Sequence, residues 1–410
     1  MNICFFSQEY PPETHIGGIG TYTYNMASAL AKYGHEVHVI ASTKNEALTV
    51  KDNGVFVHRI KRRKIKLKEL EHLYYSYLVA KKITKIDRYF DIVQSSEFAS
   101  EAFWFSMNKK FPLVTRLATP FYLLEELNGK MFFGPRPLFN WMEKKQTLNS
   151  NGIFSSTTAL AKNVVSKWKI DPSVVEVIPN SVDLSRVKRL GSNMPLPDAL
   201  QNIDYLVYFG RLEERKGVCV LAAALPSVLE RFPHLYMVFV GADFGYRGSP
   251  MRDYIFKRAK KNKNKIIFFD NLPHEELFPI VKSARIVILP SLWEAFGFVC
   301  VEAMALGRPV IATSGSGFEE IIENNISGYL IEPGNSELLA QKIINCLRNE
   351  VELRRISIGA RERAQDFEVS NVAHKLLAYY EKIIYLFSGK TKCPDDPVYH
   401  VKYTRIKKDV

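Results

Sequence analysis

The chain has 410 residues, of which 47% are hydrophobic and 24% charged, and its formal net charge is +13. This composition excludes a disordered chain, and the length predicts two domains of ordinary size. The five cysteines are far apart and form no Cys-x-x-Cys pair. We therefore expect neither a disulfide nor a zinc site, and a reducing compartment.

In the first half of the chain, short apolar runs alternate with helical stretches, the first of which is predicted over 20–33. This pattern is typical of parallel sheets with helices on both faces. The strands are predicted at 2–7, 36–41, 54–60, 91–94, 113–117, 152–155 and 174–178. The stretch 186–202 contains Pro and Gly without periodicity, so we place the link between the domains there and expect a first domain over 1–190.

The second half repeats the alternation and predicts a second doubly wound domain over 200–368. Its strands are predicted at 205–209, 236–240, 265–269, 285–289, 309–312 and 328–331, and its closing helices at 336–348, 351–366 and 369–387. The last helix is long enough to cross back onto the first domain. Residues 389–410 form a basic tail.

Glycines precede the first predicted helix in the run Gly17-Gly18-Ile19-Gly20. Glycine lets backbone amides approach a phosphate at the positive end of a helix. A dinucleotide site would require this run directly after the strand and an acidic residue at the end of the second strand. The chain instead has a nine-residue loop and ends that strand with Ala41-Ser42-Thr43-Lys44, which argues against NAD.

Two further loops follow strands of the second half and carry charge. Arg211 and Lys216 follow the strand 205–209, where a guanidinium and an ammonium can face a diphosphate. Glu294 and Glu302 flank a Phe-Gly-Phe-Val turn after the strand 285–289. Either glutamate alone is readily structural, but ligands bind at the carboxyl ends of such strands, so together with the cations they predict a site.

The run from Glu294 to Glu302 resembles the Glu, seven residues, Glu element of retaining glycosyltransferases. The whole chain over 1–387 resembles glycosyltransferase family 4, and four further segments carry that resemblance: Pro179-Asn180-Ser181-Val182-Asp183, Gly210-Arg211 with Lys216, Gly241-Ala242-Asp243, and Gly307-Arg308-Pro309-Val310. It implies an α/β protein of the GT-B fold, in which two doubly wound Rossmann-like parallel-sheet domains face a central cleft. The second domain would hold a UDP- or GDP-sugar and the first the acceptor.

The resemblance also implies roles for single residues. Arg211 and Lys216 would bind the diphosphate, and Gly18 would close over it. Glu294 would contact the donor sugar and Glu302 the ribose. The other implied contacts are the amides of Phe296, Gly297, Phe298 and Val299 on the donor side, and Arg116 and Thr119 on the acceptor side.

The implied reaction is transfer of a hexose-type sugar, with retention, to a glycan, lipid-linked or small-molecule acceptor in surface polysaccharide or glycoconjugate biosynthesis. No cofactor or metal is expected. Metal-dependent transferases of another fold use an Asp-x-Asp element, and the pair Asp395-Asp396 lies in the tail, outside both predicted domains. One position departs from the family: relatives often have a histidine where this chain has Ala118. A nucleotide-sugar-binding protein with altered or lost turnover, and a GT-B epimerase or phosphorylase, therefore remain alternatives.

Much of the positive charge is local, as in the segment from Lys61 to Lys68, which runs into an aromatic stripe over 70–79. This segment is either a peripheral contact with an anionic membrane or a solvated basic face, and the stripe is either membrane-facing or an ordinary buried helix face. No signal peptide pattern and no apolar run long enough to span a bilayer is present, so we expect a cytoplasmic protein, with the inner membrane face as a peripheral location. Regular aromatic platforms are not visible, so no specific nucleic acid is expected.

Overall fold

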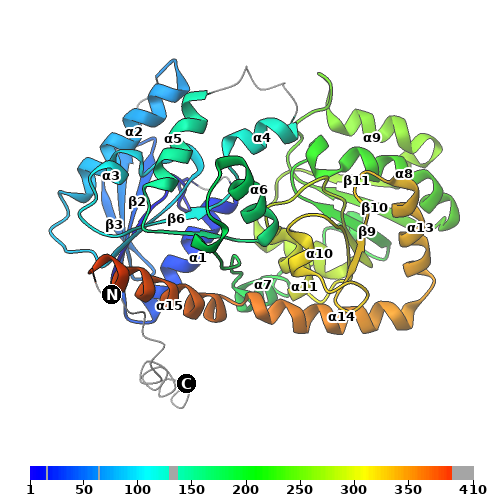
Figure 1. Ribbon diagram of the computed structural model, residues 1–410. Coiled ribbons are helices and arrows are strands. Elements are labelled where there is room, and N and C mark those ends of the chain that lie inside the picture. The colour runs from blue at the N-terminus through cyan, green and yellow to red at the C-terminus, as the bar shows by residue number, and fades with distance from the viewer. Residues whose placement is uncertain (15–16, 63–64, 129–136, 390–410) are drawn as a thin grey trace, which may run out of the picture.

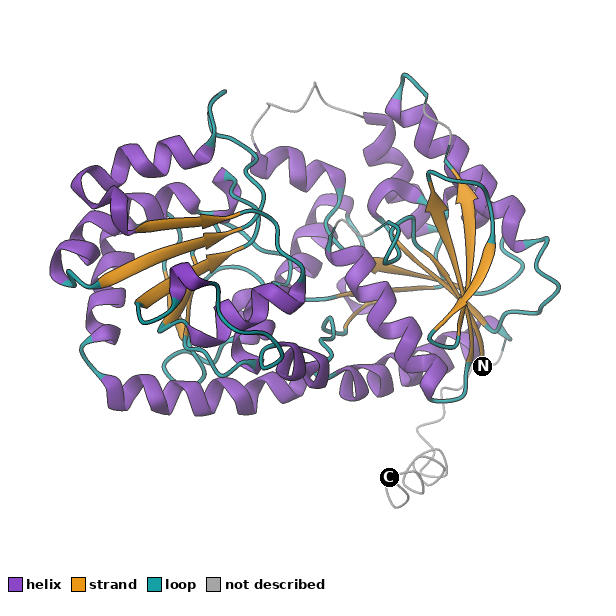
Figure 2. Cartoon of the chain, turned by 180° about the vertical axis from the view of Figure 1, so that it is seen from behind, coloured by secondary structure: helices purple, strands orange, loops and turns teal. Residues whose placement is uncertain are grey.

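The structure is a computed structural model that describes residues 1–14, 17–62, 65–128 and 137–389. Two sheets lie side by side, each with helices packed on both faces (Figures 1 and 2). The chain thus has the predicted GT-B architecture, with two doubly wound α/β halves. The predicted tail at 389–410, except Gly389, lies outside the described residues, as does Cys393.

The first sheet has the strand order β3-β4-β2-β1-β5-β6-β7-β8. Its strands are β1 (Asn2–Phe6), β2 (Glu36–Thr43), β3 (Thr49–Asp52), β4 (Val55–Lys61), β5 (Ile92–Ser96), β6 (Leu113–Leu117), β7 (Gly152–Ser155) and β8 (Val175–Val177). Its helices are α1 (Gly18–Lys32), α2 (Lys68–Ile83), α3 (Phe103–Met107), α4 (Phe121–Asn128), α5 (Pro137–Leu148) and α6 (Thr158–Trp168). Every neighbouring pair is parallel except β3 with β4.

The second sheet is entirely parallel and has the order β11-β10-β9-β12-β13-β14. Its strands are β9 (Asp204–Phe209), β10 (Leu235–Val240), β11 (Ile266–Phe269), β12 (Ile286–Leu289), β13 (Val310–Thr313) and β14 (Tyr329–Ile331). The helices are α7 (Leu184–Leu190), α8 (Val218–Arg231), α9 (Met251–Ala259), α10 (His274–Ser283), α11 (Phe298–Ala305), α12 (Phe318–Ile321), α13 (Ser336–Leu347), α14 (Glu350–Ala364) and α15 (Val369–Phe387).

Both sheets reverse their strand order at one point, between β1 and β5 in the first sheet and between β9 and β12 in the second. At such a point the loops leaving two neighbouring strands diverge to opposite faces and open a crevice at the carboxyl ends. The strands around it are apolar and buried on both faces, as expected for parallel sheets covered by helices. The fold therefore provides two crevices.

The last helix, α15, packs on the first sheet although it follows the second sheet in sequence (Figure 1). Val372, Leu376 and Tyr380 are buried in the core of the first sheet. The Tyr379 hydroxyl donates to the carbonyl of Ile153 in β7 at 3.0 Å. This helix ties the two halves together by a second connection.

Two segments differ from their sequence interpretation. The region 186–202, predicted to be an irregular link, begins with a helix, because it contains most of α7. The side chains of Leu184, Val187 and Leu190 are buried on one face of this helix. Seven residues are too few for helical periodicity to stand out. The edge strand β3 was not predicted, because its mostly exposed Thr-Val-Lys-Asp sequence has no strand-like apolar run.

The cysteines and the apolar helices were also the subject of predictions. Cys4, Cys219, Cys300 and Cys346 are free cysteines. Over the ranges that the structure describes, no helix combines the length and apolar character needed to cross a membrane.

A buried histidine pair joins strands at the edge of the first sheet. The imidazoles of His38 in β2 and His58 in β4 stack with centroids 5.2 Å apart and share a hydrogen bond of 2.9 Å. Glu36 contacts the other nitrogen of His38 at 3.0 Å, and Thr49 of β3 contacts His58 at 3.1 Å. Burial lowers the pKa of both histidines, and together with the charges of His38 and Lys82 it lowers that of His58 to about 4.

This pair makes folding stability depend on pH. A folded-state pKa below the unfolded value of about 6.5 means that the unfolded chain binds more protons, so the stabilisation is complete above pH 6.5 and is lost as the pH falls towards 4. We expect His58 alone to remove about 2 kcal/mol at pH 4.5. In urea unfolding at several pH values, His58→Gln should flatten this slope, whereas His234→Gln, at an exposed position, should not. Parallel slopes for the parent protein and His58→Gln would contradict this account.

Candidate active site

The two strand-order reversals face each other across one cavity of about 370 Å³. Loops of the first half and loops of the second half both line it. The residues predicted from sequence that line it are Gly18, Arg116, Thr119, Arg211, Lys216, Glu294, Phe296, Gly297, Phe298 and Val299, and Ala118 lines it as well. Glu302 is the one predicted site residue that is not among its lining residues.

The cationic side of the cavity follows strand β9. The 3₁₀ turn Glu214–Lys216 directs Arg215 and Lys216 towards the loop that follows β12. Glu213 accepts from Arg215 at 2.8 Å and contacts Arg211 at 3.3 Å, so one carboxylate holds both guanidiniums. Arg215 and Lys216 are largely buried, whereas the side chain of Arg211 is 49% exposed.

Glu294 forms a largely buried ion pair with Lys216, whose side chain is 17% exposed against 12% for that of Glu294. Burial alone would raise the pKa of the Glu294 carboxyl, but the nearby charges of Lys216, Arg215 and Arg211 outweigh it and hold the pKa below its usual value. The carboxylate is therefore ionised at neutral pH. An ionised acceptor next to three cations suits a site that binds sugar hydroxyls beside a diphosphate.

Gly217 brings the two loops of the second half into contact. It has φ of +69°, and a Cβ at this position would lie 1.7 Å from the carbonyl oxygen of Pro290. The backbone amide of Leu292 also donates to the carbonyl of Arg215 at 2.8 Å. Only glycine allows both the left-handed conformation and this approach, which places Lys216 beside Glu294.

Helix α11 begins at the cavity. Gly297 precedes it with φ of +105° and accepts the amide of Cys300 at 2.9 Å, so Phe298 and Val299 carry the first-turn amides that precede the helical hydrogen bonds. A Cβ built on Gly18 would lie 3.0 Å from the Phe298 ring, so the glycine run of the first half touches this helix start. Residues at the starts of α1 and α11 therefore line the same cavity, and Glu9 accepts the amide of Gly20 at 3.3 Å.

Glu302 lies one turn further along α11 and is buried. Burial raises the pKa of its carboxyl to about 7, against the opposing effect of Arg186. The structure thus separates the two glutamates: Glu294 is ionised within the cation cluster, whereas Glu302 lies behind the cavity lining. A ribose contact by Glu302 stays a prediction.

The wall of the cavity that was predicted to hold the acceptor follows strand β6. Arg116 is buried, donates to Asn180 at 3.1 Å and stacks over the Tyr22 ring at 4.1 Å. Thr119 donates its hydroxyl to the carbonyl of Ala118. The guanidinium of Arg116 is thereby fixed by neighbours that sequence reasoning did not include.

Two buried glutamates beneath this segment were missed by sequence reasoning. Glu97 accepts the amide of Ala118 with both oxygens, at 2.8 and 2.7 Å, and Glu143 accepts the amides of Phe121 and Ala99 at 2.8 and 3.1 Å. Burial raises the pKa of Glu97 to about 7 and that of Glu143 well above its usual value. The position of Glu97 just after β5, at the strand-order reversal, was the available signal.

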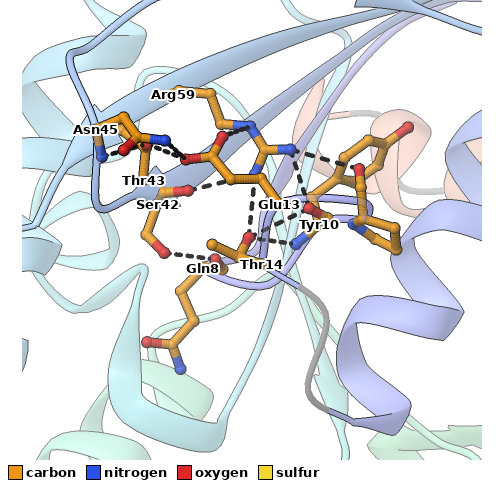
Figure 3. Close-up of polar contacts among 9 residues, drawn as sticks. Gln8, Tyr10, Glu13, Thr14, Ser42, Thr43, Asn45 and Arg59 are labelled. Carbon is orange, nitrogen blue, oxygen red and sulfur yellow. Dashed lines mark hydrogen bonds and ion pairs between the residues drawn. The ribbon is translucent and has the colours of Figure 1, made fainter. Parts of the chain in front are cut away.

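The loop that precedes the glycine run is held by one buried arginine (Figure 3). Arg59 donates to the carbonyl of Tyr10 at 2.9 Å and to the Thr14 hydroxyl at 3.0 Å, and it forms an ion pair with Glu13 at 3.4 Å. Glu13 in turn accepts hydrogen bonds from Thr43 and Asn45. Arg59 therefore fixes a loop that no predicted site residue belongs to.

Other predicted motifs have structural roles. Asp243 accepts the amides of Gly245, Met251 and Arg252 at 2.8 to 3.0 Å and so caps α9. Arg308 donates to the carbonyl of Ala284 at 3.1 Å. Within the described ranges, no three His, Cys, Asp or Glu side chains gather as a metal site would require.

Sequence and structure comparisons agree with this architecture. The profile of the Glycosyltransferase Family 4 matches residues 16–186, and that of the Glycosyl transferases group 1 matches residues 200–363. The chain is 26% identical over 358 residues to an uncharacterized glycosyltransferase, MJ1607, of Methanocaldococcus jannaschii, covering 83% of this chain and 87% of that protein. It is 24% identical over 394 residues to the D-inositol 3-phosphate glycosyltransferase of Nocardia farcinica, covering 91% and 86%.

Among solved structures, Alr3699/HepE of Anabaena in complex with UDP superimposes with a TM-score of 0.69 at 20% identity. The match covers 93% of this chain and 100% of that chain. At this identity the likeness establishes a common fold.

Proposed function

Because the chain belongs to the family-4 glycosyltransferases of the GT-B fold, we propose that it transfers a hexose-type sugar, with retention of configuration, from a UDP- or GDP-sugar to an acceptor hydroxyl. The observation that carries this proposal is the buried Lys216–Glu294 pair, with Arg211 and Arg215 beside it, at the reversal between β9 and β12. Three cations at one wall of a cavity match a diphosphate. The ionised carboxylate next to them matches the hydroxyls of the sugar attached to it.

The chemistry that this geometry favours is electrostatic. The bond between the anomeric carbon and the diphosphate oxygen breaks, and the acceptor oxygen forms a bond to the same carbon. The acceptor proton passes to the leaving phosphate oxygen, so the products are a glycoside and a nucleoside diphosphate. Arg211 and Lys216 stabilise the charge that develops on the diphosphate, and the amides at the starts of α1 and α11 add to this. No metal is needed in this scheme.

The two halves divide the substrates. We assign the nucleotide sugar to residues 200–368, with Glu302 at the ribose, and the acceptor to residues 1–190, with Arg116 and Thr119 at its edge. The acceptor is a glycan, a lipid-linked sugar or a small molecule, and surface polysaccharide or glycoconjugate synthesis in the cytoplasm is the corresponding role.

A donor panel tests the proposal. UDP-, GDP- and ADP-sugars are added to the purified protein, and the melting temperature and the release of nucleoside diphosphate are measured. A donor at about 100 times its Kd stabilises the folded state by about 2.7 kcal/mol, which raises the melting temperature by several degrees. We expect this shift for one nucleotide class, unchanged by EDTA, and an anomeric configuration retained in the product. A folded sample that responds to no donor would refute the proposal.

A second candidate, a nucleotide-sugar-binding protein with altered or lost turnover, is favoured by one observation. Ala118 lines the cavity, and no histidine is among the described residues that do so. Under this candidate, the donor shifts the melting temperature but is neither hydrolysed nor transferred. Ala118→His would then be the variant in which turnover is sought.

A further inference from the structure

One outer surface of the first half exposes several large apolar side chains. A helix face that only contacts water would normally carry polar residues instead. Helices α2, α3 and α5 lie together there (Figure 1). We define the aromatic surface as Leu70 and Tyr77 of α2, Trp104 and Met107 of α3, and Trp141 of α5, all of them exposed. Two of the four tryptophans of the chain belong to it, Trp104 at 43% and Trp141 at 52% exposure.

Ring contacts and one hydrogen bond link the two tryptophans of this surface to each other and to α2. The Phe103 ring contacts both tryptophans, with centroids 5.6 Å from Trp104 and 5.4 Å from Trp141. The Trp104 indole donates to the carbonyl of Leu73 at 3.1 Å, which seats it against α2 between Leu70 and Tyr77. The other face of α2 is buried, since Tyr75, Val79 and Ile83 belong to the core. One face of the aromatic stripe is therefore an ordinary buried helix face, and the other face is exposed.

Lysines accompany the aromatic surface at helical spacing. Lys81 follows Tyr77 by four residues within α2 and Lys145 follows Trp141 by four within α5, whereas Lys66 lies just before α2 begins at Lys68; all three lysines are exposed. Residues four apart lie on the same side of a helix. The described carboxylates of α2 and α5 do not offset this charge, because Glu71 pairs with Arg62 and Glu143 is buried.

The predicted cluster from Lys61 to Lys68 fits this role less well. Lys61 pairs with Glu46, and Arg62 donates to Glu71 and Gln8. Residues 63 and 64 and the side chain of Lys68 lie outside the described part of the chain. Among the described cations of this cluster, Lys61 and Arg62 are thus paired, and Lys66 is the member that we include with the aromatic surface.

We propose that the aromatic surface with Lys66, Lys81 and Lys145 docks the protein on a bilayer that contains anionic lipids. Tryptophan and tyrosine partition to the level of the headgroups, and lysines near the membrane surface are attracted to anionic lipid. Helix α4, which contributes Leu124 to the cavity lining, lies at the same upper end of the first half as α2 and α5 (Figure 1). Docking thus brings the acceptor side of the cavity close to the lipid. This inference goes beyond the proposed function, because lipid binding requires no turnover.

Sedimentation with vesicles tests the docking. The full chain is mixed with phosphatidylcholine vesicles and with vesicles containing 30% phosphatidylglycerol, at ~0.1 M salt. We expect binding to the anionic vesicles alone. Lys81→Glu with Lys145→Glu should reduce the partition coefficient by at least about tenfold, and Tyr77→Ser with Trp141→Ser by a similar factor. Two matched controls in the second half, the double variant Lys257→Glu with Lys261→Glu and the single variant Val351→Ser, should bind like the parent protein.

Three outcomes would overturn the inference. These are no binding to anionic vesicles, equal binding to neutral ones, and binding unchanged in both surface variants. A concentration-dependent dimer in light scattering that Trp141→Ser abolishes would assign the surface to a second copy of the chain instead. Donor hydrolysis without vesicles should be the same in all variants, so a failure of vesicle binding is distinguishable from a failure of the proposed function.

Discussion

Lys216→Met should reduce sugar transfer by a factor of about 10²–10³ in kcat, the effect expected when one preorganised charge is removed from a developing anion. The same change should destabilise the fold by about 3 kcal/mol, because Glu294 remains buried without its partner. Steady-state kinetics and urea unfolding measure the two effects separately. Lys282→Met, which removes an exposed lysine with one hydrogen bond to Ser192, should leave both nearly unchanged.

The double variant Lys216→Met with Glu294→Gln separates stability from catalysis. Removing both charges should recover most of the lost free energy of unfolding, since no uncompensated charge stays buried. Transfer should stay as low as in the single variant or lower. Near-normal turnover of Lys216→Met would contradict the diphosphate role. A double variant no more stable than the single one would show that the ion pair is not the source of the loss.

Sequence reasoning predicted the fold well because parallel strands that are buried on both faces consist mostly of apolar residues. The strands at 113–117 and 152–155 match β6 and β7 to the residue. The failures occurred where this signal is weak. Strand β3 is an exposed antiparallel edge, and α7 is too short for its apolar spacing to be recognised.

The candidate site was predictable wherever its chemistry lies next to a strand end in sequence. Arg211, Lys216 and Glu294 follow β9 and β12 directly, and the topology then brings them together. Glu97 directly follows β5 and was overlooked although it lies at such a strand end. Glu143 was not predictable in this way, because it lies within α5 and acts through backbone amides such as that of Phe121, 22 residues away, which leaves no pattern in one sequence.

Arg59 is the clearest case of such a hidden contribution, because it sits in β4 but organises the loop after β1 (Figure 3). Besides Tyr10, Thr14 and Glu13, it donates to the carbonyl of Ser42 at 3.3 Å. The same loop carries Glu9, whose carboxylate accepts the amide of Gly20 at 3.3 Å. Arg59 is thereby connected, through the loop, to the start of α1 at the cavity.

We expect Arg59→Met to destabilise the fold by about 3 kcal/mol, since it removes the buried hydrogen bonds to Tyr10, Thr14 and Ser42 together with the ion pair to Glu13. Measured well below the melting temperature, it should also raise the donor KM by about tenfold while kcat changes less, because the glycine run then has to be ordered by the donor itself. Arg59→Lys keeps the charge opposite Glu13 and should recover part of the stability but less of the KM, because an ammonium lacks the planar fork.

Arg355→Met, which removes an exposed arginine paired with Glu352, should cost less than about 1 kcal/mol and leave KM unchanged. If Arg59→Met lowers stability but binds the donor as tightly as the parent protein, the loop does not position the glycine run, and amides held elsewhere must contact the diphosphate.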